Sequence, residues 1–424
     1  MRVGLVTFYF PPLVRGGAHL SAYTLAKGLA QRGHEVHVFT ARPPEEAKGG
    51  QSGWEYPGIQ RHLIFPAAKP TTAWGQDRLS LQMGRHLRRY LSRENPPIDV
   101  WHAYGMDTIP AIVMNGRYAP TVATFNGYWA TCPFWDHTDP RTHALSAVCG
   151  AAHLWGCVQQ RGGRRGRLRR LAQWLYLVLS MRLRQHFSRQ LDLLLPISQS
   201  MRAILLANSI PPNQMQVCYN MVDLEQYQTL DRTYLQRRFG IEPSHRIVLH
   251  AGRFAPYKGT ECVIGAAPAI LARHPDVRFV IVGQGANLPA LEAQAHAAGL
   301  GDHVTFGDFI DPREMGHVYA SSYLLLHTAT WPEPFARGPV EGLAAGTAVI
   351  GTATGGTPEL IEDGVTGLLI PPFSAQAIAD ATGRLLDDPA LRDRLVHNGQ
   401  ELVRERFSIA GQIGCYESAY ASVT

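Results

Sequence analysis

The chain has 424 residues, of which 45% are hydrophobic and 17% are charged. This length predicts two or three domains, because one hydrophobic core rarely serves more than about 250–300 residues. The hydrophobic fraction excludes a disordered chain. Glycine and proline are plentiful but follow no period, which excludes collagen and indicates many loops. Six cysteines are too few for a disulfide scaffold, so we expect a reducing compartment, the cytoplasm.

The formal net charge of +6 comes from one segment. Residues 161–190 contain nine arginines and no acidic residue, and without them the chain would carry −3. A protein that coats nucleic acid would spread its basic residues more widely. No apolar run reaches the ~18–20 residues needed to cross a bilayer. The apolar residues 3–10 end at two prolines with no cleavage site after them, which indicates a buried strand rather than a signal peptide.

The first half of the chain begins with a predicted βαβ unit. Residues 3–10 form a strand typical of a buried parallel sheet. After the loop 11–17, small and apolar residues recur with helical spacing, and residues 34–40 form the second strand. Further elements are expected at residues 99–102, 121–125 and 191–198 (strands) and 171–187 (helix).

A second α/β block begins near Arg246. Its strands are expected at residues 247–250, 277–283, 303–309, 323–329, 347–353 and 367–372. The fold class is therefore α/β, with two Rossmann-like, doubly wound domains facing a central cleft and ligands at the carboxyl ends of the strands. The predicted parts are residues 1–220 with an arginine-rich insert at 158–190, residues 221–404, and a helix at 405–424 that crosses back to the first domain.

Residues 331–370 carry two glutamates near a predicted helix start. Gly338 and Pro339 are helix-start signals, so we expect Glu341 in the first helical turn and Glu333 on the loop before it. The amino end of a helix offers free N–H groups and the positive end of its dipole to an anion. A site that binds an anion and has carboxylates to accept bonds from sugar hydroxyls suits a sugar phosphate. Two glutamates at this spacing, taken alone, are more typical of exposed helix charge.

Two cations and a glycine follow the first two strands of the second block. Arg253 and Lys258 lie after the strand that ends at His250, where an arginine can grip phosphate through two bonds and a lysine acts as a point charge. Taken alone, two loop cations are more often ordinary surface residues. Gly283 follows the next strand and is expected to let the backbone approach a ligand.

These three segments, together with the first βαβ unit and residues 196–227, resemble the retaining family 4 glycosyltransferases of the GT-B fold. The resemblance covers nearly the whole chain except residues 60–100 and the arginine-rich insert. It implies transfer of a sugar from a UDP- or GDP-sugar to a hydroxyl acceptor, a glycan or a lipid-linked saccharide. It also implies that the anomeric configuration is retained and that no metal ion or other cofactor is needed.

The resemblance assigns roles on the donor side. Arg253 and Lys258 would hold the donor diphosphate, and Glu341 would bind the ribose hydroxyls. The two cations and the helix dipole would then neutralise the leaving diphosphate, an electrostatic contribution that is usually large in catalysis.

It assigns further roles around the transferred sugar. Glu333 would touch that sugar, helped by the backbone N–H groups of Phe335 and Ala336. Gly16 and Gly17 would let the first loop approach the donor phosphate and the acceptor.

One position departs from the family pattern. Many relatives place a histidine after the strand at 121–125, but this chain has Asn126, which can orient a hydroxyl but cannot act as a general base. In a retaining mechanism the leaving phosphate can take the acceptor proton, so the change need not abolish activity. His102, at the end of the preceding predicted strand, is a candidate replacement; a hydrogen-bonded structural histidine is the alternative.

Three cysteines and three histidines fall in the middle of the chain. They are Cys132, Cys149, Cys157, His137, His143 and His153. A zinc or redox site is one interpretation, but the irregular spacing favours buried or loop thiols.

The segment Arg161–Arg189 allows three interpretations. It could form a solvated face, bind nucleic acid, or lie on an anionic membrane surface. Nucleic-acid binding is disfavoured because the segment lacks interleaved aromatic residues. Apolar residues 174–179 follow the cations directly, which favours a helix at the membrane interface.

The sequence leaves one rival function open and disfavours the others. The asparagine at position 126 keeps open a catalytically silent protein that binds nucleotide-sugars or acts as a membrane scaffold. An epimerase or phosphorylase has no independent supporting feature. An NAD dehydrogenase is disfavoured because no G-x-G-x-x-G follows the first strand.

Overall fold

The chain folds into two compact units in a computed structural model. The structure describes residues 1–13, 16–42, 54–65, 72–116, 119–134, 137–138, 146, 148–161, 166–211 and 214–424. The first unit comprises Met1–Met221 and Gln412–Thr424, and the second comprises Val222–Gly411.

The return to the first unit begins later than predicted. Residues 405–411 stay with the second unit, because the Val222 N–H donates to the Phe407 carbonyl at 2.8 Å and the Ile409 N–H donates to the Val222 carbonyl at 3.2 Å. The expectation that the terminal helix leaves the second domain at residue 405 is therefore wrong by several residues.

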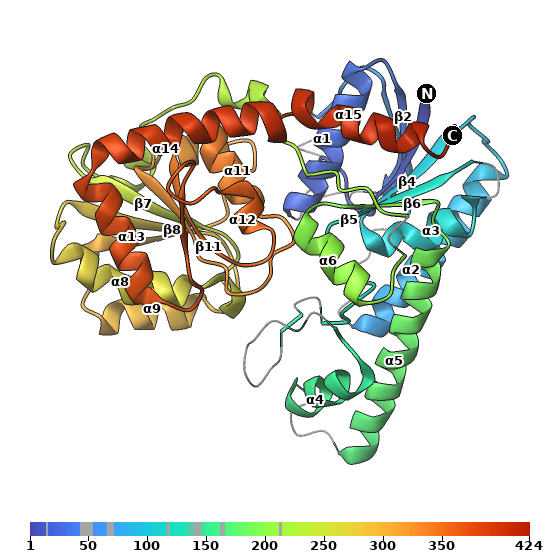
Figure 1. Ribbon diagram of the computed structural model, residues 1–424, viewed down its shortest axis with the longest axis horizontal. Coiled ribbons are helices and arrows are strands. Elements are labelled where there is room, and N and C mark those ends of the chain that lie inside the picture. Colours follow the sequence, from blue (N-terminus) through green and yellow to red (C-terminus); the bar gives the residue numbers. More distant parts are fainter. Residues whose placement is uncertain are drawn as a thin grey trace. The chain divides into compact units, whose positions relative to one another are not determined.

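The described part of the first unit is built on a six-stranded parallel sheet of order β3-β2-β1-β4-β5-β6 (Figure 1). Its strands are β1 (Arg2–Val6), β2 (Glu35–Ala41), β3 (Ile59–Phe65), β4 (Val100–Tyr104), β5 (Thr121–Phe125) and β6 (Leu193–Pro196). This is the Rossmann order, with a topological switch point between β1 and β4. The sequence analysis missed β3, because this edge strand is mostly half exposed and has no continuous apolar run.

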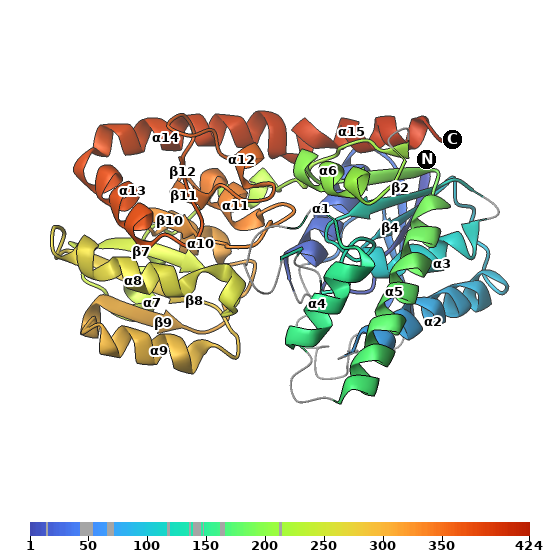
Figure 2. The same cartoon turned by 60° about the horizontal axis from the view of Figure 1, so that its bottom comes forward.

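Helices cover this sheet. They are α1 (Gly17–Gln31), α2 (Ala73–Leu91), α3 (Ile109–Val113), α4 (Ala151–Arg161), α5 (Arg167–Arg189), α6 (Gln199–Ala207) and α15 (Ile409–Ala421). The Thr72 hydroxyl caps α2 by accepting a bond from the Gly75 N–H at 3.1 Å. The first half of α5, with α4 beside it, projects beyond the sheet (Figures 1 and 2). No helix among the described residues is long and apolar enough to cross a membrane.

The second unit repeats the same architecture. Its described strands are all parallel and follow the order β12-β11-β10-β7-β8-β9, so its switch point lies between β7 and β10. The strands are β7 (Arg246–Ala251), β8 (Val277–Val282), β9 (Val304–Gly307), β10 (Leu324–His327), β11 (Ala348–Thr352) and β12 (Leu368–Ile370). The helices are α7 (Tyr234–Phe239), α8 (Thr260–Leu271), α9 (Leu288–Ala297), α10 (Met315–Ala320), α11 (Arg337–Ala344), α12 (Thr357–Leu360), α13 (Ala375–Asp387) and α14 (Pro389–Leu402).

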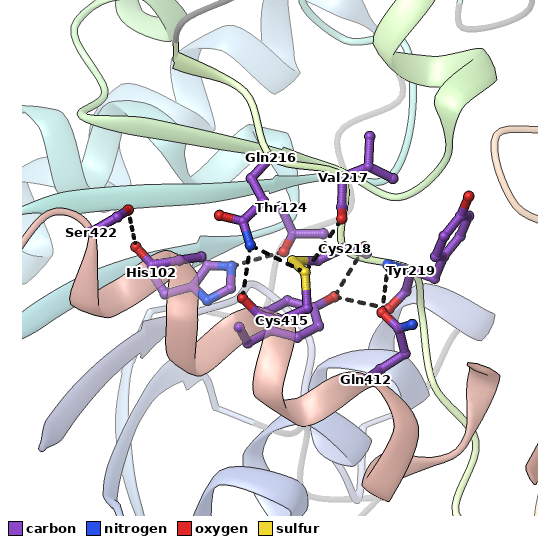
Figure 3. The surroundings of a disulfide bond; sticks show 11 residues. His102, Thr124, Gln216, Val217, Cys218, Tyr219, Gln412, Cys415 and Ser422 are labelled. Atoms are coloured by element: carbon purple, nitrogen blue, oxygen red, sulfur yellow. Dashed lines mark hydrogen bonds between the residues drawn. A yellow bond between two sulfur atoms is a disulfide. The ribbon is translucent and has the colours of Figure 1, made fainter. Parts of the chain in front are cut away.

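A disulfide fastens the end of the chain to the first unit (Figure 3). Cys415 on α15 is bonded to Cys218, 197 residues earlier. Beside it, the Gln216 amide donates to the Cys415 carbonyl and the Tyr219 N–H donates to the Gln412 side chain, each at 3.1 Å. The sequence alone does not predict this bond, because no local spacing relates two cysteines so far apart.

The remaining four cysteines lie in buried or partly exposed positions. Cys132, Cys149 and Cys157 are buried, as the favoured interpretation expected, and Cys262 is partly exposed. The described residues contain no cluster of three His, Cys, Asp or Glu side chains that could hold a metal ion. His143, one of the histidines considered for such a site, lies outside the described residues.

Candidate active site

The switch point of the second unit gathers most of the predicted donor residues. β7 and β10 are neighbours, with Leu324 paired to Val248, so their carboxyl ends lie side by side. The loop after β7 carries Arg253 and Lys258, while β10 ends at His327 and leads to Glu333. In doubly wound sheets this crevice is the usual place for a ligand.

Three of these side chains, Lys258, Glu333 and His327, lie in contact. Lys258 Nζ lies 2.8 Å from Glu333 Oε1, and His327 Nε2 lies 3.2 Å from Glu333 Oε2. Burial would raise the pKa of Glu333, but the Lys258 charge and the contacts with His327 outweigh it and lower the pKa to about 2. Glu333 is therefore a carboxylate at any physiological pH. The sequence predicts Lys258 and Glu333 but not His327, whose only signal is its place at the end of a strand.

A double glycine supports the Glu333 loop. The Gly356 N–H donates to the Glu333 carbonyl at 2.8 Å. Gly355 has φ +54°, and a Cβ there would lie 2.3 Å from the same carbonyl oxygen. Only glycine combines this conformation with this close approach, so the glycines of residues 355–356 hold Glu333 in place.

Gly283 serves loop packing at the same edge of the sheet. A Cβ on Gly283 would lie 1.8 Å from the Gly252 carbonyl oxygen, and the Gly252 N–H donates to the Val282 carbonyl at 3.0 Å. The close approach expected at Gly283 is thus to the loop that carries Arg253. Arg253 itself is exposed, and it makes no ion pair with any other described residue.

The helix that carries Glu341 begins earlier than predicted. α11 starts at Arg337 with Ala336 as its N-cap, which places Gly338 and Pro339 in the first turn and Glu341 in the second. Proline is tolerated there because its missing N–H would have no partner within the helix. The prediction of Glu341 in the first turn is therefore wrong. Phe335 and Ala336, buried just before the helix, keep the predicted position beside its amino end.

Glu341 is buried and already held on both sides. Arg337, one turn earlier, bonds one carboxylate oxygen, and the Tyr319 hydroxyl donates to the other at 3.1 Å. The carboxylate is thus fixed in orientation.

The first unit carries Gly16, Gly17 and Asn126 after the carboxyl ends of β1 and β5. Gly16 and Gly17 are exposed at the start of α1, directly after the loop that follows β1. Asn126 follows β5 and is partly exposed, and its side chain makes no hydrogen bond to another described residue. Its amide is therefore free to bind a ligand.

The structure adds a carboxylate that the sequence analysis missed. Asp107 follows β4, and the pairing of Tyr104 with Thr124 places it near the residues that follow β5, where Asn126 lies. Burial raises the pKa of Asp107 to about 6, opposed by its own backbone N–H and by the charge of Arg184. No motif marks this residue; its only signal is a position just past a strand end.

His102 is not part of this site. It lies in the middle of β4 rather than at the end of a strand, and it is fully buried. Its ring bonds the Tyr420 hydroxyl at 2.6 Å and the Thr124 hydroxyl at 2.8 Å. Burial lowers its pKa to about 3, so it is neutral. The structural interpretation of His102 is therefore correct, and the proposal that it replaces the missing histidine is wrong.

The arginine-rich insert contributes one buried residue to the same region. Arg184 is 1% exposed, and its guanidinium pairs with Asp77 at 2.8 Å and donates to the Trp129 carbonyl at 3.1 Å. It therefore fixes the segment that follows Asn126. Arg184 is not available to a membrane, in contrast to the sequence-based expectation for the whole insert; Arg164 and Arg165 lie outside the described residues.

Two protein-family models match this chain. The family "Glycosyltransferase Family 4" matches residues 15–226, and "Glycosyl transferases group 1" matches residues 231–402. The two matches together cover both units and nearly the whole chain. The chain therefore belongs to the family 4 glycosyltransferases, as the sequence motifs indicated.

Individual relatives show how far the similarity extends. The chain is 24% identical to an uncharacterized glycosyltransferase of Methanocaldococcus jannaschii over 425 aligned residues, covering 96% of this chain and 95% of that protein. It is 24% identical to the N-acetyl-alpha-D-glucosaminyl L-malate synthase of Bacillus anthracis, covering 96% and 94%. An alpha-D-kanosaminyltransferase of Streptomyces kanamyceticus is 35% identical, but over only 42% of this chain and 46% of that protein.

Solved structures share the fold. A crystal structure of Anabaena HepE in complex with UDP-glucose superposes with a TM-score of 0.73 at 20% identity, covering 100% of both chains. Sucrose-phosphate synthase from Thermosynechococcus elongatus gives a TM-score of 0.75 at 20% identity and 99% coverage of both chains. The chain thus has the GT-B fold of two Rossmann-like domains.

Proposed function

We propose that this glycosyltransferase moves a sugar from a UDP- or GDP-sugar to a hydroxyl acceptor with retention of anomeric configuration. The observation that carries the proposal is the Lys258–Glu333–His327 cluster at the β7–β10 switch point. It sets a cation for phosphate beside a carboxylate for sugar hydroxyls. The UDP-glucose complex of Anabaena HepE supports a nucleotide-sugar donor.

The donor roles follow from chemistry and position. Arg253, exposed and free of ion pairs among the described residues, and Lys258 would neutralise the diphosphate. Glu341, fixed by Arg337 and Tyr319, would accept bonds from the ribose hydroxyls. Glu333 would accept bonds from the transferred sugar. We propose that these cations neutralise the diphosphate without a metal ion, so activity should persist in excess chelator.

The N–H groups of Phe335 and Ala336 would face the sugar or phosphate beside Glu333. Gly283 would act indirectly, by holding the Arg253 loop. These two contributions are steric and electrostatic rather than acid–base.

The chemical step needs no basic side chain from the protein. The bond between the anomeric carbon and the diphosphate breaks, and the acceptor oxygen bonds to the same face. The acceptor proton passes to the departing diphosphate oxygen. Asn126 and Asp107 would orient the acceptor hydroxyl, with Gly16 and Gly17 leaving room beside them. The acceptor class that we propose is a glycan or a lipid-linked saccharide.

The second candidate is a catalytically silent protein that binds nucleotide-sugars or acts as a scaffold, favoured by asparagine at position 126. Incubating the chain with a panel of UDP- and GDP-sugars, with and without saccharide acceptors, separates the two. Transfer with retained configuration supports the proposal. Donor binding with neither transfer nor slow hydrolysis overturns it in favour of the silent protein.

The expected location at the cytoplasmic face of a membrane stays a prediction. The Cys218–Cys415 disulfide is the observation against it, because a reducing cytoplasm opens most disulfides. Rapid alkylation of thiols in intact cells, followed by mass spectrometry of both cysteines, measures which state is present.

A further inference from the structure

A row of exposed leucines runs along α5. Leu168, Leu171, Leu175, Leu179 and Leu183 are each between 41% and 83% exposed. At about 100° and 1.5 Å per residue, these five positions fall within an arc of about 120° and extend over about 22 Å. A continuous apolar surface of this kind on a folded protein marks an interaction site.

The apolar surface continues onto α2. A groove of about 430 Å³ separates the two helices, and its walls include Leu81 and Trp74 of α2 beside Leu179 and Leu183 of α5. Trp74 is 58% exposed, with the Arg78 guanidinium 5.4 Å from its ring centre. An exposed tryptophan beside an arginine is typical of residues at a membrane–water interface.

The exposed charged side chains described on α2 and α5 are positive. Arg167 and Arg169 are exposed at the start of the leucine row, Arg182 is exposed near its other end, and Arg78 and Arg85 line the groove. Helices α2, α4 and α5 together contain a single acidic residue, Asp77. Its carboxylate already accepts hydrogen bonds from Arg184, Tyr176 and Ser180.

We propose that this face, the leucine row of α5 together with the α2–α5 groove, docks on an anionic phospholipid bilayer. The leucines and Trp74 enter the interface, and the arginines contact lipid phosphates. A second copy of the chain is a poorer occupant, because a symmetric contact would set arginine against arginine. The proposal does not depend on the proposed activity.

The residues that the structure exposes for membrane contact differ from those expected from the sequence. The apolar run 174–179 was expected to lie on the membrane, but the Trp174 ring donates to the Ala151 carbonyl of α4 and Leu177 is buried. From that run, Leu175 and Leu179 belong to the exposed row. The row extends well beyond the run in both directions.

Sedimentation of the full chain with lipid vesicles tests the proposal. One vesicle set is pure phosphatidylcholine and the other contains 30 mol% phosphatidylglycerol, each at low and at high salt. The wild-type chain should bind the anionic vesicles and be released by salt, because exposed charges are screened. Leu175→Glu/Leu179→Glu should weaken binding by about a hundredfold or more, since each of the two buried leucines contributes roughly a factor of ten or more. Arg167→Gln/Arg169→Gln should weaken it by about fivefold per arginine and flatten the salt dependence.

Matched controls are available on the second unit. Arg384→Gln/Arg394→Gln removes two exposed arginines from α13 and α14, and Val365→Glu changes a side chain that is 40% exposed. Both should bind vesicles like the wild type. Circular dichroism and nucleotide binding of every variant show that folding is intact.

Three outcomes overturn the proposal. In the first, the wild-type chain sediments equally with both vesicle types or with neither. In the second, the leucine variant remains folded and binds as tightly as the wild type. In the third, analytical ultracentrifugation shows a dimer that the leucine variant abolishes, which means that a second copy occupies the face.

Discussion

The Lys258 ammonium lies 2.8 Å from the Glu333 carboxylate, so the residue assigned to the donor diphosphate and the residue assigned to the transferred sugar share one ion pair. Their side chains are only 19% and 15% exposed. An incoming diphosphate would therefore compete with Glu333 for Lys258. The geometry couples recognition of the phosphate to the freedom of the carboxylate that meets the sugar.

Lys258→Met should weaken nucleotide-sugar binding by about 10- to 100-fold, because a charge-assisted bond to phosphate is lost. It should also lower the melting temperature, since Glu333 would stay largely buried without its main counterion. Calorimetry and thermal unfolding measure the two effects. Arg273→Met, which breaks the exposed ion pair with Asp387, is the control and should change neither. Unchanged donor affinity in Lys258→Met would contradict the phosphate role.

Glu341→Gln should reduce affinity for the nucleoside diphosphate about tenfold, because a neutral amide accepts bonds from ribose hydroxyls less strongly than a carboxylate. Titration calorimetry with UDP and GDP gives the values. Glu242→Gln, at an exposed position of the same unit, should bind like the wild type. If affinity for the free nucleotide does not change while affinity for the sugar nucleotide falls, Glu341 contacts the sugar and not the ribose.

Gly355→Ala should impair turnover and lower stability more than Gly364→Ala. Both glycines have positive φ, +54° and +73°, so the strain of a left-handed alanine is common to the two variants, at about 1 kcal/mol. Only at Gly355 would the new methyl group meet the Glu333 backbone, whereas the space around Gly364 is open. Thermal unfolding and steady-state kinetics of the pair isolate the displacement of Glu333. Equal losses of turnover and stability in both variants would show that the contact with Glu333 does not contribute to either.

Asp107 should give the activity an ionisation near pH 6. If its carboxylate orients the acceptor hydroxyl, turnover should rise as pH increases through the raised pKa of about 6. Asp107→Asn should lose this limb and reduce turnover, while donor affinity stays the same. A wild-type profile that is flat between pH 5 and 7, or a limb that survives in Asp107→Asn, would remove Asp107 from the acceptor site.

The same substitution has a predicted effect on stability. The folded state holds the Asp107 proton more tightly than the unfolded chain. Ionisation of this group therefore lowers the free energy of unfolding as pH rises from about 4 to 6. Asp107→Asn should lessen that decline. Chemical unfolding of both proteins at several pH values measures it.

The strands of the second unit could be read from the sequence because most are apolar runs buried on both faces, as Val277–Val282 illustrates. The edge strand Ile59–Phe65 could not, since solvent on one side removes that pattern. The start of α11 was placed too late because Gly338 and Pro339 fit a helix start as well as the positions they occupy inside its first turn.

The site divides along the same line. Lys258 and Glu333 lie in motifs that resemble those of the family, so the resemblance could assign their roles before their geometry was known. His327 and Asp107 lie at strand ends without a motif, and only the pairing of neighbouring strands places them beside the other site residues. The strand that carries His102 was expected to end at residue 102 but ends at Tyr104, so His102 is buried within the strand instead of lying at its end.

The disulfide between Cys218 and Cys415 closes a covalent ring that contains the whole second unit, because the two cysteines are 197 residues apart and flank that unit. A protease that cuts one peptide bond within residues 222–411 would open this ring without releasing a fragment. The nicked protein would migrate as one species until it is reduced, and only then separate into two. In the oxidised chain a single cut therefore does not separate the two fragments. In the reduced chain no covalent bond joins them after the same cut.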